Sequence, residues 1–333
     1  MTLGSGGYIS QAIAVADLNH DGKQDVIVAD WWDPSTLQGA VGVLLRNADG
    51  GFRPVVTYNT GGPPNYGVFV ADVNKDGKPD IIASSCAPSN ATCGSADGVV
   101  SVLLGNGDGT FQPAVSFDTG AANGVAVWVA DLNSDGKPDL IVANVYGETN
   151  GDGTVAVLLG NGNGTFQPTV LYDSGAPDAN GVTVADVNGD GVPDLLVANR
   201  CVSCNGGVLG VLLGNGDGTF QPPVTYATGG TYSVWVSVAD LNGDGISDVV
   251  VANENLDTAE GSVAVLLGKG NGAFDPPVTY GSGRYAAVGT AIADLNGDRK
   301  RDIIVASCGP VGGCGTGQIG VLLARAMARS SRL

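Results

Sequence analysis

Acidic and amide side chains recur at fixed spacing in short loops of this chain. The stretch DLNSDGKPD, residues 131–139, places Asp, Asn, Asp and Asp at its positions 1, 3, 5 and 9, with glycine at position 6. Carboxylate and amide oxygens are the ligands that Ca²⁺ prefers, and the ion takes about six to eight of them. Glycine at position 6 permits the positive φ that folds such a loop over an ion. The stretch therefore predicts a calcium site.

The same nine-residue loop occurs six times, and successive loops start 55, 59, 55, 54 and 54 residues apart. Isolated Asp and Asn often only cap turns, but repetition of the same four oxygen positions favours cation binding. Without a cation, close carboxylates would repel by roughly 4 kcal/mol per pair at intermediate dielectric. The candidate metal ligands are Asp17, Asn19, Asp21, Asp25, Asp72, Asn74, Asp76, Asp80, Asp131, Asn133, Asp135, Asp139, Asp186, Asn188, Asp190, Asp194, Asp240, Asn242, Asp244, Asp248, Asp294, Asn296, Asp298 and Asp302.

The sixth loop departs from the pattern. Arg299 replaces the glycine, and Arg301 stands immediately before Asp302. A positive side chain and the loss of glycine both weaken a cation site. We therefore expect about five to six Ca²⁺ per chain, with the weakest binding in the sixth loop.

The composition excludes several classes of function. The formal net charge of −18 would repel nucleic acid and anionic membranes, so neither is expected as a partner. His20 is the single histidine, which leaves almost nothing for a Ser-His-Asp triad, a Cys-His pair or a multi-histidine metal site. Nothing indicates a catalytic residue or an organic cofactor.

The acidic loops lie between apolar segments. In the third unit, strands are expected at 125–131, 139–144, 154–160 and 166–172. Four strands in a repeat of about 55 residues predict an all-β fold, a β-propeller of four-stranded antiparallel blades. Six blades are expected in residues 1–324, followed by a non-repeat basic tail at 325–333. A fragment of a larger propeller is the alternative, because the sixth unit stops before its last turn and strand.

Two kinds of connection alternate in each unit. With strands A to D in chain order, the A–B loop and the C–D turn must lie at one end of a blade, and the B–C and D–A connections at the other. The first end is nearly uniform, whereas the B–C loops diverge. Divergent loops on a rigid scaffold suit a ligand. One aromatic position after the C–D turn is predicted to anchor packing between blades: Phe111, Phe166, Phe220 and Phe274.

Two features of the divergent loops indicate further roles. Trp31, Trp32 and Asp33 combine aromatic rings with a carboxylate, which suits a sugar, although the indoles could instead only cover the first blade. The cysteines fall in three close pairs, Cys86–Cys93, Cys201–Cys204 and Cys308–Cys314. Their even number and spacing predict three local disulfides and an oxidising compartment.

The repeats resemble FG-GAP/VCBS repeats, the propeller blades of integrin α-subunit heads and many exported bacterial proteins. The DxNxDGxxD loop between two strands carries the resemblance over nearly all of residues 1–324, while Val142-Ala143-Asn144 stands where GAP is expected and favours the bacterial-type variant. The resemblance implies a calcium-stiffened propeller used in adhesion or in binding a protein or carbohydrate ligand.

Two other functions remain open. A calcium-dependent polysaccharide lyase, or another carbohydrate-active enzyme, is the enzymatic alternative, and a ligand-free structural module of a larger surface protein is the third. The paired cysteines favour a secreted or cell-surface location. The N-terminus shows no signal peptide, and no apolar run is long enough to span a membrane.

Overall fold

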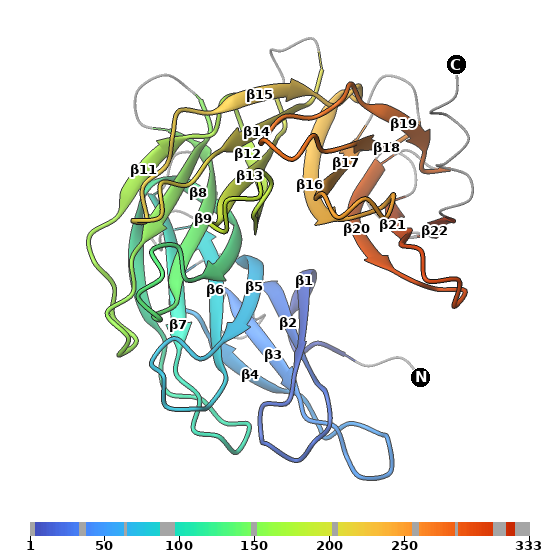
Figure 1. Cartoon of the computed structure of the whole chain (residues 1–333). Coiled ribbons are helices and arrows are strands. Elements are labelled where there is room, and N and C mark those ends of the chain that lie inside the picture. Colours follow the sequence, from blue (N-terminus) through green and yellow to red (C-terminus); the bar gives the residue numbers. More distant parts are fainter. Residues whose placement is uncertain are drawn as a thin grey trace. The chain divides into compact units, whose positions relative to one another are not determined.

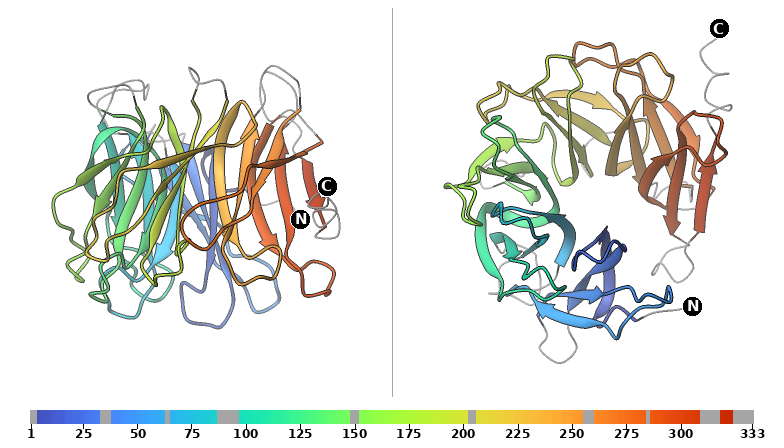
Figure 2. Two further views of the ribbon diagram at one scale, coloured as in Figure 1. Left: turned by 45° about the horizontal axis from the view of Figure 1, so that its top comes forward. Right: turned by 60° about the horizontal axis from the view of Figure 1, so that its bottom comes forward.

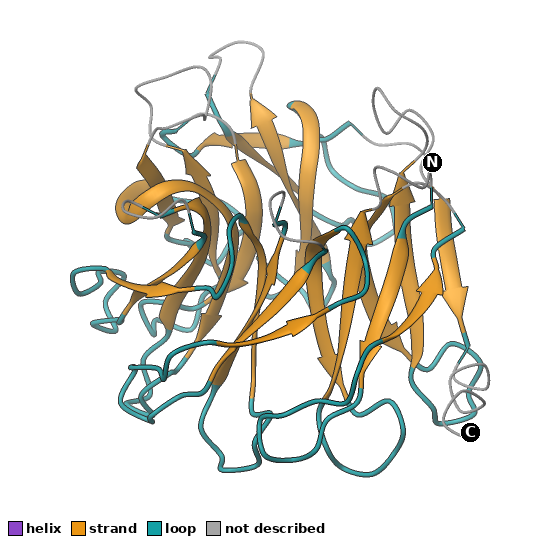
Figure 3. Cartoon of the chain, turned by 90° about the horizontal axis from the view of Figure 1, so that it is seen from above, coloured by secondary structure: helices purple, strands orange, loops and turns teal. Residues whose placement is uncertain are grey.

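A computed structural model describes residues 4–32, 38–62, 65–86, 97–147, 152–201, 206–254, 260–283, 286–308 and 318–323. Within these ranges the regular elements are β-strands, and no helix is present (Figure 3). The fold is the predicted one, all-β with four-stranded antiparallel blades of a β-propeller. Two compact units divide the chain, Met1–Asn150 with Thr154–Tyr172 and Gly151–Gly153 with Asp173–Leu333.

The first unit holds blades 1 to 3 (Figure 1). Blade 1 has the strand order β1-β2-β3-β4. Blades 2 and 3 form one seven-stranded sheet, because β8 is strand D of blade 2 and continues as strand A of blade 3. The bounds are β1 (Tyr8–Ala16), β2 (Asp25–Trp32), β3 (Ala40–Leu44), β4 (Val56–Asn59), β5 (Asn65–Ala71), β6 (Asp80–Cys86), β7 (Asp97–Leu103), β8 (Val115–Ala130), β9 (Asp139–Tyr146), β10 (Thr154–Leu158) and β11 (Val170–Asp173).

The second unit holds blades 4 to 6, which Figure 2 shows in two further views. Blade 4 has the order β12-β13-β14-β15, and blade 5 has β16 to β19. Blade 6 has three strands in the described residues, and one pairing between Glu254 and Ala286 joins it to blade 5. The bounds are β12 (Ala179–Ala185), β13 (Asp194–Asn199), β14 (Val208–Leu212), β15 (Val224–Ala227), β16 (Tyr232–Ala239), β17 (Asp248–Glu254), β18 (Ser262–Leu266), β19 (Val278–Gly281), β20 (Ala286–Ala293), β21 (Asp302–Cys308) and β22 (Gln318–Leu322).

The core of each unit lies between neighbouring blades. On β6, Ile81 packs into a cluster with side chains of blade 1, whereas its neighbour Ile82 packs into a cluster with blade 3. Because successive side chains of a strand point to opposite faces, strand B contributes apolar side chains to both clusters. Each fully buried aliphatic side chain of this kind contributes about 1.5–3 kcal/mol. This explains the continuous apolar runs that follow the acidic loops.

The fourth strand is shorter than the sequence predicts. Residues 166–172 were expected to be extended, but β11 begins at Val170, and Phe166 forms only an isolated bridge to Gly160. Pro168 lies between them, and a proline has no backbone N–H to donate to a ladder. Residues 1–3 and the basic tail at 325–333 lie outside the described residues. The expected domain boundaries therefore remain a prediction.

Candidate metal centre

In the acidic loops, side-chain oxygens accept hydrogen bonds from backbone N–H groups of the same loop. In the third loop, Asp131 Oδ1 and Asn133 Oδ1 both accept from the backbone N of Asp135, each at 3.1 Å. Asp131 Oδ2 accepts from the backbone N of Gly136 at 2.8 Å. The first and second loops repeat this arrangement. The oxygens of positions 1 and 3 are therefore brought together by the sequence of the loop itself.

Positions 4 and 6 have positive φ. Position 6 is Gly136 in the third loop, with φ of 76°, and position 4 is Ser134, with φ of 59°. Position 4 is glycine in loops four to six, where its N–H donates to the position-1 carboxylate, as from Gly189 to Asp186 Oδ1 at 2.7 Å. Loops with glycine at position 4 and loops with another residue there thus share positive φ at positions 4 and 6.

The carboxylate at position 9 is buried and joins two connections of its blade. Asp139 is 0% exposed, and its Oδ2 accepts from the backbone N of Leu132 at 2.8 Å. Its Oδ1 accepts from the backbone N of Gly160, in the C–D turn, at 2.7 Å. Burial raises the pKa of Asp139, and burial raises that of Asp80, at the same position, to about 6. These are structural hydrogen bonds that sequence reasoning, which treated position 9 only as a metal ligand, had not predicted.

The position-5 carboxylate has a lysine partner in the first three loops. Lys137 Nζ lies 3.0 Å from Asp135 Oδ2, and the corresponding distances in loops one and two are 3.2 Å and 3.4 Å. Hydrogen bonds and the positive charge of Lys137 hold the pKa of Asp135 below its usual value. Loop four has Val192 in place of the lysine, and there Asn188 Nδ2 donates to Asp190 Oδ2 at 2.8 Å. The six loops are therefore electrostatically unequal.

The sixth loop keeps the backbone fold without its glycine. Arg299 has φ of 66°, and its backbone N donates to Asp294 Oδ2 at 2.8 Å, as glycine does in the other loops. A residue with a side chain is disfavoured in this left-handed conformation. The structure therefore places a strained, positively charged residue at this point of the sixth loop.

The donor set fits a hard cation. Positions 1, 3, 5 and 9 offer only oxygen, and a carboxylate oxygen that accepts one hydrogen bond keeps a further lone pair. The described residues contain no group of three or more Asp, Glu, His or Cys side chains already positioned to hold a metal ion. In loops one to five the position-5 carboxylate contacts a lysine or asparagine side chain of its own loop. The metal ligands remain a prediction.

The other ends of the blades carry the divergent loops. Trp31 is half-buried, and its ring centroid lies 6.5 Å from that of Tyr66. The side chain of Trp32 and the whole of Asp33 lie outside the described residues, so the aromatic ligand site remains a prediction. Cys201 is buried, and neither Cys201 nor Cys308 is a free thiol. Cys93, Cys204 and Cys314 lie outside the described residues, so the three pairings also remain predictions.

Sequence reasoning missed a charged cluster at this end of blades 4 and 5. Arg200 Nη2 lies 3.3 Å from Glu254 Oε2, and the guanidinium carbon lies 5.2 Å from the ring centroid of Tyr232. Arg200 directly follows Asn199, the last residue of β13, in a chain with 15 basic residues. Unlike most basic residues of the chain, Arg200 lies outside the acidic loops and the tail, and this position was the signal available in the sequence.

Comparison with known proteins defines the family. The model of the FG-GAP-like repeat matches residues 17–83, 91–142, 131–197, 201–251 and 240–305. The chain belongs to the FG-GAP-like repeat family, as the resemblance predicted, and its repeats are integrin-like propeller blades.

Curated relatives are integrin α chains. The chain is 32% identical to integrin alpha pat-2 of Caenorhabditis elegans over 205 residues, 53% of this chain and 16% of the relative. It is 28% identical to integrin alpha-IIb of Mus musculus over 216 residues, 57% of this chain and 20% of the relative. The matched segment thus spans a fifth or less of the length of these relatives.

A solved structure with a similar fold is the NanB sialidase of Streptococcus pneumoniae. The TM-score is 0.56 at 10% sequence identity, with 95% of this chain and 67% of the sialidase covered. A likeness at this identity concerns the fold alone. Within the part of the chain that the structure describes, no helix has the length and apolar character needed to cross a membrane.

Proposed function

We propose that the chain is an exported, calcium-binding β-propeller that mediates adhesion, or binds a protein or carbohydrate ligand, through its B–C and D–A connections. One observation carries the calcium part of the proposal. The same oxygen-bearing loop recurs in every repeat, and in each loop the position-1 and position-3 oxygens accept hydrogen bonds from backbone N–H groups of that loop, as in the third and fourth loops. The similarity to integrin α chains supports adhesion or ligand binding.

The residues of each loop would have different roles. Positions 1, 3 and 5 would hold Ca²⁺ together with the buried position-9 carboxylate, and the ion would supply positive charge to a cluster of negative groups. Position 9 also ties the A–B loop to the C–D turn through its two backbone hydrogen bonds. A bound ion would therefore stiffen one end of the blade, while the divergent loops at the other end stay available for a ligand.

The ligand would contact groups that the divergent loops present. Trp31, Trp32 and Asp33 are the proposed contacts in blade 1. The Arg200–Glu254 pair adds polar groups in the second unit. The proposed disulfides, Cys86–Cys93, Cys201–Cys204 and Cys308–Cys314, would shorten the free length of three of these loops and so lower the entropy lost on binding.

Thermal unfolding with and without calcium tests the proposal. A ligand that binds the native state stabilises it by RT ln(1 + [L]/Kd), about 2.7 kcal/mol per site at a hundredfold excess over Kd. We expect a higher melting temperature in calcium than in EGTA, and about five to six ions per chain by equilibrium dialysis and elemental analysis. Equal melting temperatures together with less than one ion per chain would contradict the calcium assignment.

The enzymatic alternative gains no support from the likeness to a sialidase, because that likeness shows the fold alone. An assay for unsaturated products from uronate-containing polysaccharides separates a lyase from a binding protein. Glycan-array and cell-adhesion assays, compared between the intact chain and Trp31→Ala, separate a ligand-binding propeller from a ligand-free structural module. Retention of neither protein above background on any surface would favour the structural module.

A further inference from the structure

The C–D turn of blade 3 has an asparagine followed by glycine, Asn163-Gly164, where two other blades have an aspartate. Asp108 of blade 2 and Asp217 of blade 4 stand at the repeat position of Asn163. Asn163 is exposed, and so is Thr165, two residues further along the chain. Water therefore reaches the side-chain amide of Asn163, in a turn that carries a carboxylate elsewhere in the repeat.

An asparagine before a glycine can lose its amide group without an enzyme. The backbone nitrogen of the glycine gives its proton to hydroxide and forms a bond to the asparagine Cγ, which places negative charge on Oδ1. The bond from Cγ to Nδ2 then breaks, and ammonia leaves with a proton from water, which regenerates hydroxide. A second water opens the succinimide ring to aspartate or isoaspartate. Glycine favours this attack because it has no side chain in the way.

Thr165 provides two hydrogen-bond donors to the oxygen on which this charge develops. Its backbone N donates to Asn163 Oδ1 at 3.1 Å, and its hydroxyl donates to the same oxygen at 2.6 Å. The hydroxyl oxygen accepts in turn from Asn161 Nδ2 at 3.0 Å, which orients the hydroxyl. Donors that already point at a developing oxyanion stabilise the transition state of attack on a carbonyl group. The turn thus favours attack on its own amide.

The attacking nitrogen is free in this turn but not in the corresponding turn of blade 5. In the part of the chain that the structure describes, no hydrogen bond holds the N–H of Gly164. In blade 5 the N–H of Gly272 donates to the carbonyl oxygen of Val187 at 3.1 Å. Asn271, which is also exposed, has Ala273 in place of the threonine, so the donor there is the backbone N of Ala273 at 3.2 Å. Asn271 therefore lacks both the free nitrogen and the hydroxyl.

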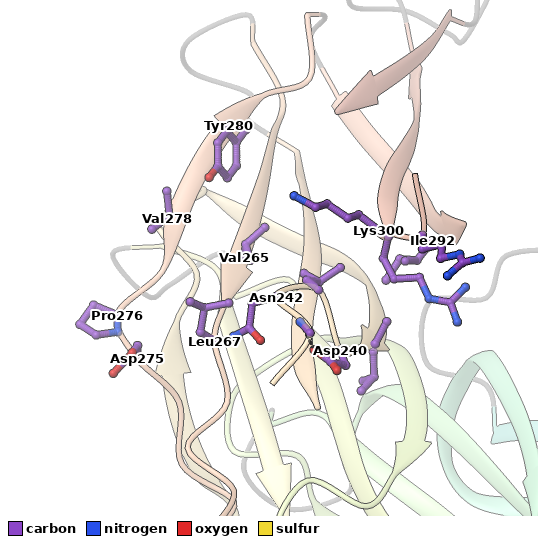
Figure 4. Close-up of a pocket in the computed structure, with 16 residues that line it drawn as sticks. Asp240, Asn242, Val265, Leu267, Asp275, Pro276, Val278, Tyr280, Ile292 and Lys300 are labelled. Carbon is purple, nitrogen blue, oxygen red and sulfur yellow. Dashed lines mark hydrogen bonds between the residues drawn. The ribbon is translucent and has the colours of Figure 1, made fainter. Parts of the chain in front are cut away.

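The asparagines of acidic loops four to six also precede a glycine whose N–H is held. The N–H of Gly243 donates to Asp240 Oδ1 at 2.6 Å, and Figure 4 shows Asp240 and Asn242 of this loop. Gly189 and Gly297 make the same bond at 2.7 Å. An N–H that is bonded to a carboxylate gives up its proton less readily than a free one. These predicted calcium ligands are therefore protected from loss of the amide.

Other Asn-Gly pairs lack the donors or the freedom of Asn163. The first asparagine of the C–D turns uses its amide nitrogen to donate to the threonine hydroxyl, and within the described turns its Oδ1 accepts no hydrogen bond, as in Asn106, Asn161 and Asn215. Asn123 and Asn180 lie within strands β8 and β12. Two further pairs begin at residues outside the described ranges. Among the described pairs, the arrangement at Asn163 is thus the most favourable.

We propose that Asn163 is a site of self-catalysed deamidation. Gly164 provides the attacking nitrogen, Thr165 stabilises the charge on Oδ1, and water completes the conversion of the amide to a carboxylate. The reaction consumes one water, releases one ammonia and needs no other reactant. It adds one negative charge to the C–D turn of blade 3.

The aspartyl product would match the corresponding turn of blade 2. There Asp108 Oδ1 accepts from the backbone N of Thr110 at 2.9 Å and from its hydroxyl at 2.6 Å. These hydrogen bonds and the positive charge of Lys78 hold the pKa of Asp108 below its usual value. Lys137 holds the repeat position of Lys78 in blade 3, where it lies 3.0 Å from Asp135. Deamidation therefore gives Lys137 a second acidic partner.

Peptide mapping by mass spectrometry tests the proposal on the intact, folded chain. The chain is incubated at mildly alkaline pH, and the fractions of Asn163 and Asn271 converted to aspartate or isoaspartate are followed with time. We expect Asn163 to react about tenfold or more faster than Asn271, because Asn163 has the hydroxyl donor and the free nitrogen. In concentrated urea the two should react at similar rates, because each is then an asparagine before glycine in an open chain. Equal rates in the folded chain, or an unchanged ratio in urea, would overturn the proposal.

Variants at the threonine separate its hydroxyl from its packing. Thr165→Val keeps the branched shape but removes the hydroxyl, and we expect it to slow the conversion of Asn163 about tenfold. Thr165→Ser keeps the hydroxyl and should react at nearly the original rate. Thr110→Val makes the same change in blade 2 and should leave Asn163 unaffected, with circular dichroism to check that each variant folds. Conversion in Thr165→Val that is as fast as in the original chain, or equal slowing in Thr110→Val, would overturn the role of the hydroxyl and with it the proposal.

Discussion

Asp139 Oδ1 lies 2.7 Å from the backbone N of Gly160, so the residue that closes the acidic loop also holds the turn between strands C and D. The same contact recurs in the other complete blades, as between Asp194 and Gly214 at 2.8 Å. The buried carboxylate therefore belongs to the fold as well as to the candidate metal site. The two roles can be separated by experiment.

Replacement of Asp139 by asparagine should destabilise the protein even without calcium. The amide keeps one acceptor oxygen, but its NH₂ group faces a backbone N–H that then has no acceptor. A buried hydrogen bond to a charged group is worth about 1.5–3 kcal/mol, and we expect a loss of this size in urea unfolding in EGTA. Asp135→Asn is the matched control, because Asp135 is exposed in the same loop, and it should change stability by less than about 0.5 kcal/mol.

Calcium binding should be weakened in both variants, unlike stability in EGTA. Both residues are proposed ligands, so both variants should bind calcium more weakly at the third loop. Equal losses for Asp135→Asn and Asp139→Asn in EGTA would show that position 9 has no structural role beyond that of position 5.

Replacement of Lys137 by isoleucine should strengthen calcium binding at the third loop. The ammonium group lies 3.0 Å from Asp135 Oδ2 and competes with a cation for that carboxylate, whereas the fifth loop has Ile246 at this position. Exposed ion pairs are worth about 0.2–1 kcal/mol, so the affinity should rise by about 1.5- to fivefold in a calcium titration.

The control for this change is Lys269→Ile, which removes a lysine paired with Asp275 at 3.0 Å outside the acidic loops. It should leave the affinity of the third loop unchanged. An equal rise in both variants would indicate a general effect of net charge.

Much of the fold could be predicted from the sequence because the repeat is regular. The loop spacing and the apolar runs on either side of residues 131–139 predicted the number and order of strands in a blade. Pro168 was visible too, and its missing N–H explains why β11 begins only at Val170.

The site was less predictable than the fold. Spacing identified oxygen-bearing positions, but the distant partner of Asp139 in the C–D turn depends on how the blade closes, as does the pairing of Arg200 with Glu254 across two blades. Contacts that join segments from different repeats leave no periodic signal in the sequence.

Replacement of Arg299 by glycine should stabilise blade 6. The left-handed conformation costs a residue with a Cβ roughly 1–2 kcal/mol. Glycine removes this cost, but its greater freedom in the unfolded chain offsets part of the gain in stability. We expect a net gain of about 0.5–1 kcal/mol in urea unfolding in EGTA. The reverse change in the third loop, Gly136→Arg, should lower stability by a similar amount, because Gly136 has φ of 76°. A loss of stability in both variants would contradict the strain argument.

Removal of the ring at Phe274 should weaken the packing of blade 5 on blade 4. Phe274 is 5% exposed, and buried phenylalanine to alanine changes cost about 3–5 kcal/mol, whereas Tyr146→Ala, at a side chain that is 42% exposed, should cost much less. The contact with Tyr226 itself is measured by a double-mutant cycle with Tyr226→Ala. An edge-on aromatic pair is worth about 0.5–1.5 kcal/mol beyond buried area, so the two losses should not add. Strict additivity would show that Phe274 acts by filling space alone.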